Sequence, residues 1–420
     1  MLSAAARAPR RRVRVPRLST RSFATESVSS SDVTPNLPPP TKHPIAKPRS
    51  ASRLSPSPRP AVSHQRQALP HLPSTFGRNQ LLPVSNSTRA LLESIVAEFD
   101  APIRYAFAYG SGVFEQDGYP ADQKGPMLDF MFAVTHPSHF HSINMNQHPS
   151  HYALHARLFG SSFVTKVQET GPGVWFNAFV PIKGVVSLLY GVTTVDNLSS
   201  DLLKWNTLYL AGRMHKPLRI IKDDARVRLT QQVNLTSAVR AALLALPAEF
   251  SETQLFSKIA GISYGGDPRM LLPAENRGKV GNIVSKQSPQ FRELYHRLVV
   301  GLPGVHWPTH ASMIQQDTSS IARAAHLKKL PSNLLGRVRG QYASATGFPT
   351  LEADEGAYWQ KIAGDEKLPL VVTEQMKGIV RGPATIQTLK GIVSGGLSTT
   401  VRYSAEKIGK YFKGRQQGHS

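Results

Sequence analysis

The chain has 420 residues and a mass of 46.0 kDa, which is enough for two domains of ordinary size and additional tails. Its formal net charge of +23 and its pI near 10.3 favour a polyanionic partner such as a nucleic acid, a phospholipid or a nucleotide. The absence of cysteine excludes disulfides, thiol catalysis and cysteine-based zinc sites, and no apolar window is long enough to predict a membrane span.

The N-terminal region has the composition of a targeting segment followed by a linker. The first 25 residues contain seven Arg together with Ser and Ala, and no acid precedes Glu26. This pattern predicts a mitochondrial transit peptide over residues 1–30, and the alternative is a basic arm that binds nucleic acid. Residues 31–80 are rich in Pro and Ser and poor in large apolar side chains, so we expect a disordered linker there.

Regular helix and strand patterns begin near Asn86. The stretch NSTRALLESIVAEF has a capping residue followed by apolar residues at helical spacing. The apolar runs from Ile103 to Tyr109 and from Met127 to Val134 predict strands inside a sheet, and GVWFNAFVPI and VVSLLYGVTT predict two more. This alternation predicts an α/β or α+β domain over residues 86–221.

The rest of the chain has a mostly helical pattern. The stretch DNLSSDLLKWNTLYLAGRMHKPL predicts a helix, with Gly212 and Pro217 as the stop signals at its C-terminal end. Its aromatic residues are expected in the core rather than in a cofactor pocket. Residues 222–340 predict a second, α-rich domain, and residues 341–420 form a C-terminal region.

The stretch YAFAYGSGVF, followed by MLDFMF, points to a binding site for phosphate. A strand that ends in Gly-Ser and enters a helix leaves backbone N–H groups unpaired, and glycine lets a phosphate approach them closely. If the two strands are neighbours, Asp129 faces the same crevice as Gly110 and could hold Mg²⁺ against a triphosphate. The alternative for such an Asp is a turn or a salt bridge.

Motifs in a fixed order from Asn86 to Phe412 carry a resemblance to a known family. They are YGSGVFEQDGY with MLDFMFAV, FHSINMNQHPSHYAL, DLLKWNTLYLAGRMHKPL, GDPRM with ENRGKVGNIVSKQ, and LKGIVSGGLSTTVRYSAEKI. With these motifs the sequence resembles the mitochondrial phosphatidate cytidylyltransferases, the translocator assembly and maintenance family. The resemblance implies an α+β fold with a nucleotidyltransferase-like mixed sheet domain, a winged-helix-like second domain and a C-terminal amphipathic helix.

The resemblance also implies a reaction and its partners. The expected enzyme makes CDP-diacylglycerol and pyrophosphate from CTP and phosphatidate, uses Mg²⁺, and feeds phosphatidylglycerol and cardiolipin synthesis. It is expected to be a peripheral protein on the matrix side of the mitochondrial inner membrane, without a nucleic acid partner. Two alternatives remain open: a nucleotidyltransferase acting on RNA ends, and a catalytically inactive protein that binds RNA or anionic lipid.

The resemblance assigns roles to residues at matching positions. Gly110, Ser111 and Gly112 would cradle the CTP phosphates, while Asp129 would bind the metal and act in catalysis with Asp267. A second polar cluster, for which the alternative is a solvated loop, consists of Asp267, Arg269, Glu275, Asn276 and Lys279. Within that cluster, Arg269 and Lys279 would bind phosphate groups.

Further candidate contacts with the substrates are His141, Ser142, Asn144, Tyr190, Arg213 and Lys216. For Arg213 and Lys216 the alternative is that they complement a helix C-terminus. Six of the fifteen His lie between His136 and His155, but their spacing does not match a three-ligand zinc motif, so no metal is expected there.

The chain departs from the expected patterns at two positions. Met131 stands where nucleotidyltransferases commonly have a second carboxylate, so a second metal ligand is expected from Asp201 or Asp267. Leu189 stands where the family has a Lys immediately before Tyr-Gly-Val. If that Lys contacts phosphate in the family, this chain lacks the contact unless Lys183 supplies it.

The C-terminal region predicts a basic amphipathic helix. Apolar residues recur at helical spacing from Ile386 to Phe412, and Lys and Arg residues lie between them. Such a helix binds an anionic membrane surface, and the alternative is a helix packed on the core of the protein itself.

Overall fold

The computed structural model describes residues 73, 75–114, 127–182, 186–271, 278–343 and 354–417, and it gives only the backbone at residues 111, 181–182, 186–187, 271 and 396–417. The predicted transit peptide, most of the predicted linker, and residues Lys183, Glu275 and Asn276 lie outside this part of the chain.

A five-stranded mixed sheet with the strand order β3-β4-β2-β1-β5 forms the first half of the described chain. Its strands are β1 (Tyr105–Tyr109), β2 (Leu128–Val134), β3 (Trp175–Ile182), β4 (Val186–Thr194) and β5 (Leu218–Lys222). β2 pairs parallel with β4, and the other neighbours pair antiparallel. The four predicted strands and the mixed α+β class are confirmed, whereas β5 was not predicted.

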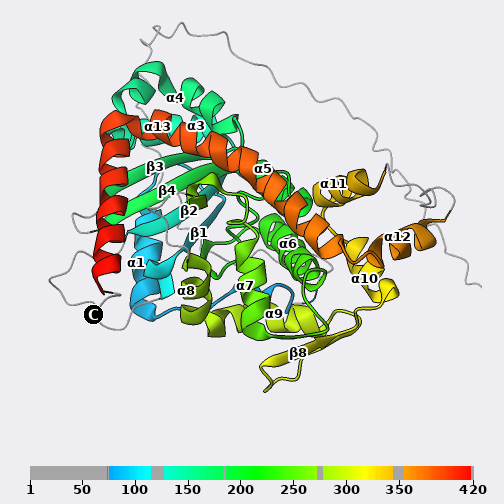
Figure 1. Cartoon of the computed structure of the whole chain (residues 1–420). Helices are drawn as coiled ribbons and strands as arrows, with labels where there is room; N and C mark the ends of the chain where they lie inside the picture. The colour runs from blue at the N-terminus through cyan, green and yellow to red at the C-terminus, as the bar shows by residue number, and fades with distance from the viewer. Residues whose placement is uncertain are drawn as a thin grey trace, which may run out of the picture. The chain divides into compact units, whose positions relative to one another are not determined.

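The two faces of this sheet pack against different layers, because successive residues of a strand point to opposite sides. Phe130 and Phe132 of β2 share a core with Leu92 of α1 (Asn86–Ala97) and Phe140 of α3 (Pro137–Gln147). Met131 of the same strand belongs to a core that extends into the helices that follow β4. We call these helices the helical half of the protein. Figure 1 shows the sheet with α1 close by and the helical half on its other flank.

The layer that contains α3 also includes η2 (Pro149–His151), α4 (Leu154–Glu169) and, after β1, α2 (Ser111–Phe114). The element η1 (Arg78–Gln80), ahead of α1, instead bonds to the helical half through the carbonyls of Leu294 and Arg228. α1 is capped by the Ser85 side chain, which accepts the Thr88 N–H at 3.2 Å. The predicted helix therefore forms, with its cap one residue ahead of the predicted start.

The helical half contains most of the remaining helices. They are α5 (Val195–Lys204), α6 (Ala225–Leu243), α7 (Glu252–Gly261), η3 (Pro268–Leu271), α8 (Lys279–Lys286), α9 (Ser288–Val300), α10 (Ser320–Leu327), α11 (Ser332–Tyr342) and α12 (Glu355–Ala363). A small antiparallel sheet in the order β6-β8-β7 lies among them, formed by β6 (Glu249–Ser251), β7 (Val305–His306) and β8 (Met313–Gln316).

The predicted helix over residues 196–217 is much shorter in the structure. α5 ends at Lys204, and Trp205 follows in the left-handed conformation with φ 55°. The cause is Asp201, whose Oδ1 accepts the N–H groups of Thr207 and Leu208 and whose Oδ2 accepts those of Leu210 and Ala211. These bonds replace helical hydrogen bonds and fold residues 205–211 into a compact loop.

The long helix α13 (Leu368–Gln417) crosses the molecule, and Figure 1 shows it running from α12 to α4 before it bends. Its first half packs on the protein itself, since Leu368, Val372, Met376 and Ile379 are buried. The predicted amphipathic segment begins further on, at Ile386, and at its start Gln387, Lys390 and Ser394 are buried, so the alternative in which the helix packs on the protein itself applies to this start. Among the described residues, no helix combines the length and apolarity needed to span a membrane.

Candidate functional site

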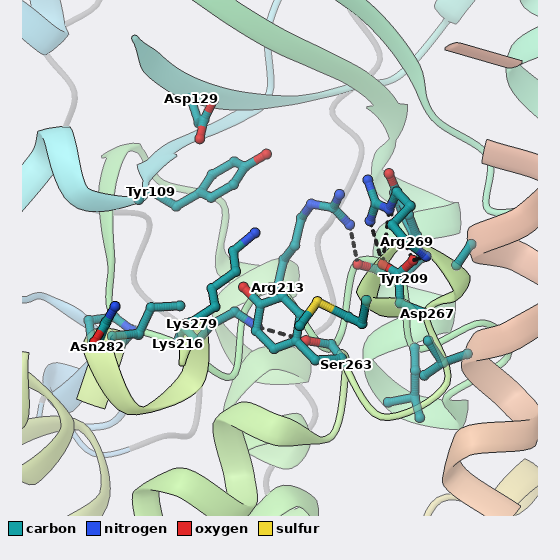
Figure 2. Close-up of a pocket in the computed structure, with 18 of the residues that line it drawn as sticks. Tyr109, Asp129, Tyr209, Arg213, Lys216, Ser263, Asp267, Arg269, Lys279 and Asn282 are labelled. Carbon is teal, nitrogen blue, oxygen red and sulfur yellow. Dashed lines mark hydrogen bonds and ion pairs between the residues drawn. The ribbon is translucent and has the colours of Figure 1, made fainter. Parts of the chain in front are cut away.

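A cavity of about 470 Å³ lies between the ends of the central strands and the helical half. Figure 2 shows charged and aromatic side chains from both parts pointing into it. The lining residues used below are Tyr109, Gly110, Asp129, Leu189, Tyr209, Arg213, Lys216, Ser263, Tyr264, Asp267, Arg269, Asn282, Lys279, Lys286, Val380 and Ala384.

The end of β1 meets the start of β2 at the floor of this cavity. Tyr109 pairs with Asp129 across the two strands, and the next residue, Gly110, has φ +93°. A Cβ atom at Gly110 would lie 3.2 Å from Asp129 Oδ2. Glycine is therefore required twice, for the backbone conformation and for the close approach of the carboxylate. The predicted meeting of Gly110 and Asp129 is present.

Asp129 is an unusual carboxylate: the residue is half-buried, and one of its two oxygens is buried without a hydrogen-bond donor in the described part of the chain. Within the described residues, Oδ1 has no hydrogen-bond partner and no access to solvent. Burial raises the pKa of Asp129 to about 7, although the charges of Arg213 and Lys279 oppose the rise. A carboxylate in this state gains much from a cation placed at its open oxygen.

Arg213 occupies the middle of the cavity in Figure 2, between Asp129 and Asp267. Its Nη1 donates to the Tyr209 carbonyl at 2.8 Å, and its guanidinium carbon lies 3.8 Å from the centroid of the Tyr209 ring. This stacking holds the planar cation in one orientation and leaves its charge facing the cavity.

Two lysines flank Tyr264 at the lower side of the cavity. Lys216 Nζ and Lys279 Nζ lie 4.9 Å and 5.3 Å from the centroid of the Tyr264 ring. Lys216 also donates to the Gly212 carbonyl at 2.6 Å and to Ser263 Oγ at 2.8 Å. Burial, together with the nearby charges of Arg213 and Lys279, lowers the pKa of Lys216 to about 7.

Asp267 and Arg269 form a tight pair on the side of the cavity opposite Asp129 (Figure 2). Arg269 Nε donates to both Asp267 oxygens, at 3.0 and 3.1 Å, and Nη2 donates to Oδ2 at 2.5 Å. Burial alone would raise the pKa of Asp267, but the hydrogen bonds and charge of Arg269 outweigh it and lower the pKa. Asp267 therefore orients Arg269, and its oxygens are already occupied.

The GDPRM segment is held in place by α13. A Cβ atom at Gly266 would lie 2.1 Å from the carbonyl oxygen of Lys377, so only glycine allows this contact. The predicted turn at Gly266 thus exists, and the segment lines the cavity as well.

The donor set around Asp129 fits a magnesium ion that is shared with a substrate. Within the described ranges no cluster of three or more His, Asp, Glu or Cys side chains could hold a metal by itself. Mg²⁺ commonly binds through one or two carboxylates, completed by phosphate oxygens and water. Asp129 lines the cavity and has an oxygen without a hydrogen-bond partner among the residues described, so it could supply such a ligand, and Asp267, paired with Arg269, is less suited.

Three predicted substrate contacts lie on the other face of the sheet. His141, Asn144 and Tyr190 form a buried network in which His141 Nδ1 bonds Tyr152 Oη at 2.9 Å and Asn144 Nδ2 donates to Tyr190 Oη at 2.8 Å. None of the three lines the cavity. Tyr190 follows Leu189 on β4, and strand alternation sends the two side chains to opposite faces.

The remaining predictions are also placed by the structure. Asp201 is buried by the backbone bonds described above and lies outside the cavity, so it stabilises a loop. Ser142 is exposed beside a hollow between α3 and α4.

Met131, at the position of the missing carboxylate, is fully buried. Gly112 is buried in α2, and Leu189 lines the cavity beside Asp129, its partner in the β2–β4 register.

Sequence reasoning missed several residues of the cavity. Ser263 and Tyr264 follow α7, Asn282 and Lys286 belong to α8, and Val380 and Ala384 belong to α13. The spacing of Lys279, Asn282 and Lys286 on one helical face, within the ENRGKVGNIVSK stretch, could have indicated the α8 residues.

Comparisons with known proteins identify a family. Residues 92–410 match a family model described as mitochondrial phosphatidate cytidylyltransferase. A mitochondrial phosphatidate cytidylyltransferase of Xenopus laevis is 36% identical over 343 residues, covering 81% of this chain and 99% of the relative. The Saccharomyces cerevisiae protein of the same name is 39% identical over 279 residues, covering 66% and 69%. The Homo sapiens protein is 36% identical over 320 residues, covering 76% and 69%.

Proposed function

The chain belongs to the family of mitochondrial phosphatidate cytidylyltransferases, and from this premise we propose that CTP and phosphatidate react in the cavity between Asp129 and Arg269. The enzyme is a nucleotidyltransferase that makes CDP-diacylglycerol. An oxygen of the phosphatidate phosphate forms a bond to the α-phosphorus of CTP. The bond from that phosphorus to the β-phosphate oxygen breaks, and pyrophosphate leaves.

One observation carries the proposal: a carboxylate with one unpaired oxygen, next to a glycine bend, lines the same cavity as a group of cations. Asp129 has the Oδ1 that is unpaired among the described residues, and Gly110 lines the cavity beside it. The cations that line the same cavity are Arg213, Lys216, Arg269, Lys279 and Lys286. Such a set suits a substrate with several negative charges.

Asp129 would hold Mg²⁺ together with phosphate oxygens of CTP. When bound, the ion would neutralise triphosphate charge and polarise the α-phosphoryl group. A cation at Oδ1 also removes the cost of burying this carboxylate without a partner.

The other charged side chains position the two phosphate-bearing substrates. Lys216 and Lys279 lie near each other around Tyr264 and would bind the triphosphate and then the departing pyrophosphate. Arg269, fixed in orientation by Asp267, presents its guanidinium at the other side of the cavity and would bind the phosphatidate head group. Arg213, between them, would contact both.

No side chain is needed as a nucleophile or a strong general base. The phosphate of phosphatidate is already anionic near neutral pH, so catalysis depends on positioning and on charge neutralisation. The cations along the cavity let two anions approach each other, which is the main electrostatic obstacle to this reaction.

The cellular location is proposed from the relatives and from the C-terminal helix. The relatives are named mitochondrial, and we place this enzyme at the matrix side of the inner membrane as a peripheral protein. The C-terminal part of α13 would bind the anionic surface, so deletion after Gly395 should weaken binding to liposomes. Residues 386–394 must be retained, because Lys390 donates to the carbonyls of Gln168 and Thr170.

The experiment that tests the function measures CDP-lipid formation from labelled CTP and phosphatidate in detergent with Mg²⁺. We expect Asp129→Asn to lower kcat by about 100- to 1,000-fold, since the variant keeps the shape of the side chain but loses its charge. Asp196→Asn is the matched control, because Asp196 is an exposed surface carboxylate whose side chain is 81% accessible.

Thermal unfolding of both variants shows whether the fold is retained. Full activity of a folded Asp129→Asn variant would exclude the metal role of this residue. Absence of CDP-lipid from the wild-type protein, with transfer to an RNA end instead, would exclude the proposed substrate.

A further inference from the structure

An exposed apolar surface lies where α4 meets α13, outside the charged cavity. We call it the α4–α13 surface. Three of its side chains belong to α4, namely Leu154, Leu158 and Phe159, with exposed fractions of 67%, 75% and 67%. Three belong to α13, namely Leu389, Ile392 and Val393, with exposed fractions of 60%, 43% and 39%. Single exposed apolar residues are ordinary, but a group on two joined helices indicates an interaction surface.

The two helices are fixed to each other by polar contacts. His155 Nε2 contacts the Val393 carbonyl at 2.6 Å, and Lys390 Nζ donates to the carbonyls of Gln168 and Thr170 at 2.9 and 2.8 Å. Figure 1 shows α13 passing close to α4 at this end of the molecule. The α4–α13 surface is therefore preformed.

The charge near the exposed apolar residues of α4 is positive. No Asp or Glu occurs from Thr135 to Gln168 or from Gln375 to Ala405, and the one acid of α4 is Glu169 at its C-terminal end. α4 also carries the exposed cations Arg157 and Lys166. Exposed apolar side chains with cations beside them complement an anionic bilayer, where the apolar groups enter the acyl boundary and the cations meet phosphate groups.

The surface also lies near the cavity along α13. Val380 and Ala384 line the cavity, and an α-helix rises about 1.5 Å per residue, so Leu389 and Val393 lie about 8 and 14 Å further along the axis. A bilayer resting on the α4–α13 surface would therefore come close to the side of the cavity that α13 lines.

We propose that the α4–α13 surface seats the enzyme on an anionic bilayer, with Leu154, Leu158 and Phe159 of α4 inserted into it. This inference rests on the proposed function, because it explains how a lipid substrate reaches the cavity. It assigns half of the membrane contact to α4, a helix more than 200 residues away in sequence from the C-terminal amphipathic segment.

The test is flotation of the full chain with phosphatidylcholine vesicles that contain phosphatidate or phosphatidylglycerol. The double variant Leu158→Asn, Phe159→Asn should bind these vesicles at least about tenfold more weakly, because two exposed apolar side chains no longer enter the bilayer. Ile321→Asn is the matched control: Ile321 is 68% exposed on α10, which lies near the other end of α13 (Figure 1). Its binding should not change.

A second variant tests the charge separately. Arg157→Glu should weaken binding to the anionic vesicles and leave the weak binding to pure phosphatidylcholine unchanged. Turnover of phosphatidate dissolved in detergent should stay within twofold of wild type for all these variants, since none lies in the cavity.

The outcomes separate this inference from the proposed function. Unchanged flotation of the double variant, with the fold intact by thermal unfolding, overturns the membrane role of α4. Sedimentation showing that the double variant dissociates a wild-type dimer, with flotation unchanged, would assign the surface to a second copy of the chain and also overturn the inference. Failure of the wild type to make CDP-lipid in detergent contradicts the proposed function, whatever flotation shows.

Discussion

The two faces of the five-stranded sheet both bury polar side chains, but one face holds a neutral hydrogen-bonded network and the other holds a carboxylate beside several cations. On the face toward α3, both ring nitrogens of His141 are bonded, to Tyr152 at 2.9 Å and Gln168 at 2.8 Å, and the Tyr190 hydroxyl contacts Asn144 and His151. On the face toward the helical half, Asp129 keeps an open oxygen beside a cavity lined with cations.

This difference shows which buried polar groups serve the fold and which serve chemistry. Burial costs a polar group free energy unless a partner compensates it. The network of His141 and Tyr190 meets most of that cost within the protein, although Asn144 Oδ1 has no hydrogen-bond partner among the described residues. Asp129 does not, and a substrate or a metal ion would complete it. Polarity alone, read from sequence, does not distinguish the two cases.

The largest loss of activity on the cavity face is expected from a substitution at Gly110. Gly110→Ala forces a side chain into a conformation with φ +93° and toward Asp129 Oδ2 at 3.2 Å. We expect kcat to fall about 100-fold, because displacement of a catalytic group by about 1 Å has effects of this size. The assay is CDP-lipid formation in detergent.

Gly160→Ala is the control for backbone strain. Gly160 also has positive φ, +77°, but no atom lies within 4 Å of its Cβ position. Both variants should lose about 1–3 kcal/mol of stability, and only Gly110→Ala should lose activity in detergent. Equal activities would mean that the approach of Gly110 to Asp129 has no role in the reaction.

A change on the opposite face should affect stability and leave turnover intact. Tyr190→Phe removes a hydroxyl that contacts Asn144 at 2.8 Å and His151 at 2.9 Å. The free energy of unfolding should fall by about 1–3 kcal/mol, because buried groups lose their partner. Urea unfolding measures this loss. A kcat lowered more than about tenfold without loss of stability would instead return Tyr190 to the active site.

The smallest expected effect is a pH dependence of CTP binding through Lys216. Burial and neighbouring cations lower the pKa of Lys216 to about 7, so the ammonium is present below pH 7 and is lost above it. The KM for CTP should therefore rise a few-fold between about pH 6 and about pH 8, one unit on either side of this pKa. Lys216→Arg, which stays charged, should show a weaker dependence, and identical profiles would contradict the assignment.

The strands of the sheet could be predicted because their residues are apolar and lie in runs of the right length. The loop over residues 205–211 could not, since its conformation depends on Asp201 accepting hydrogen bonds from amides up to ten positions away. The apolar spacing of that stretch is compatible with a helix, and only the tertiary contact decides against it.

Only part of the site could be predicted, because some of its residues are brought there by tertiary contacts that leave no signal in the sequence. Gly110 and Asp129 followed from local motifs on adjacent strands, and Arg269 and Lys279 from the resemblance. The residues of α13 that line the cavity carry no chemical signal in the sequence, because Val380 and Ala384 contribute only shape. His141 and Asn144 resembled binding residues, and the register of β4 places their partner Tyr190 on the far face.

The central claim is that Asp129 binds a metal ion together with CTP. Calorimetric titration of CTP into the wild type and into Asp129→Asn, each with Mg²⁺ and with a chelator, tests it most directly. We expect Mg²⁺ to strengthen CTP binding to the wild type, and we expect Asp129→Asn to bind CTP equally with and without Mg²⁺. The same gain from Mg²⁺ in both proteins would contradict it.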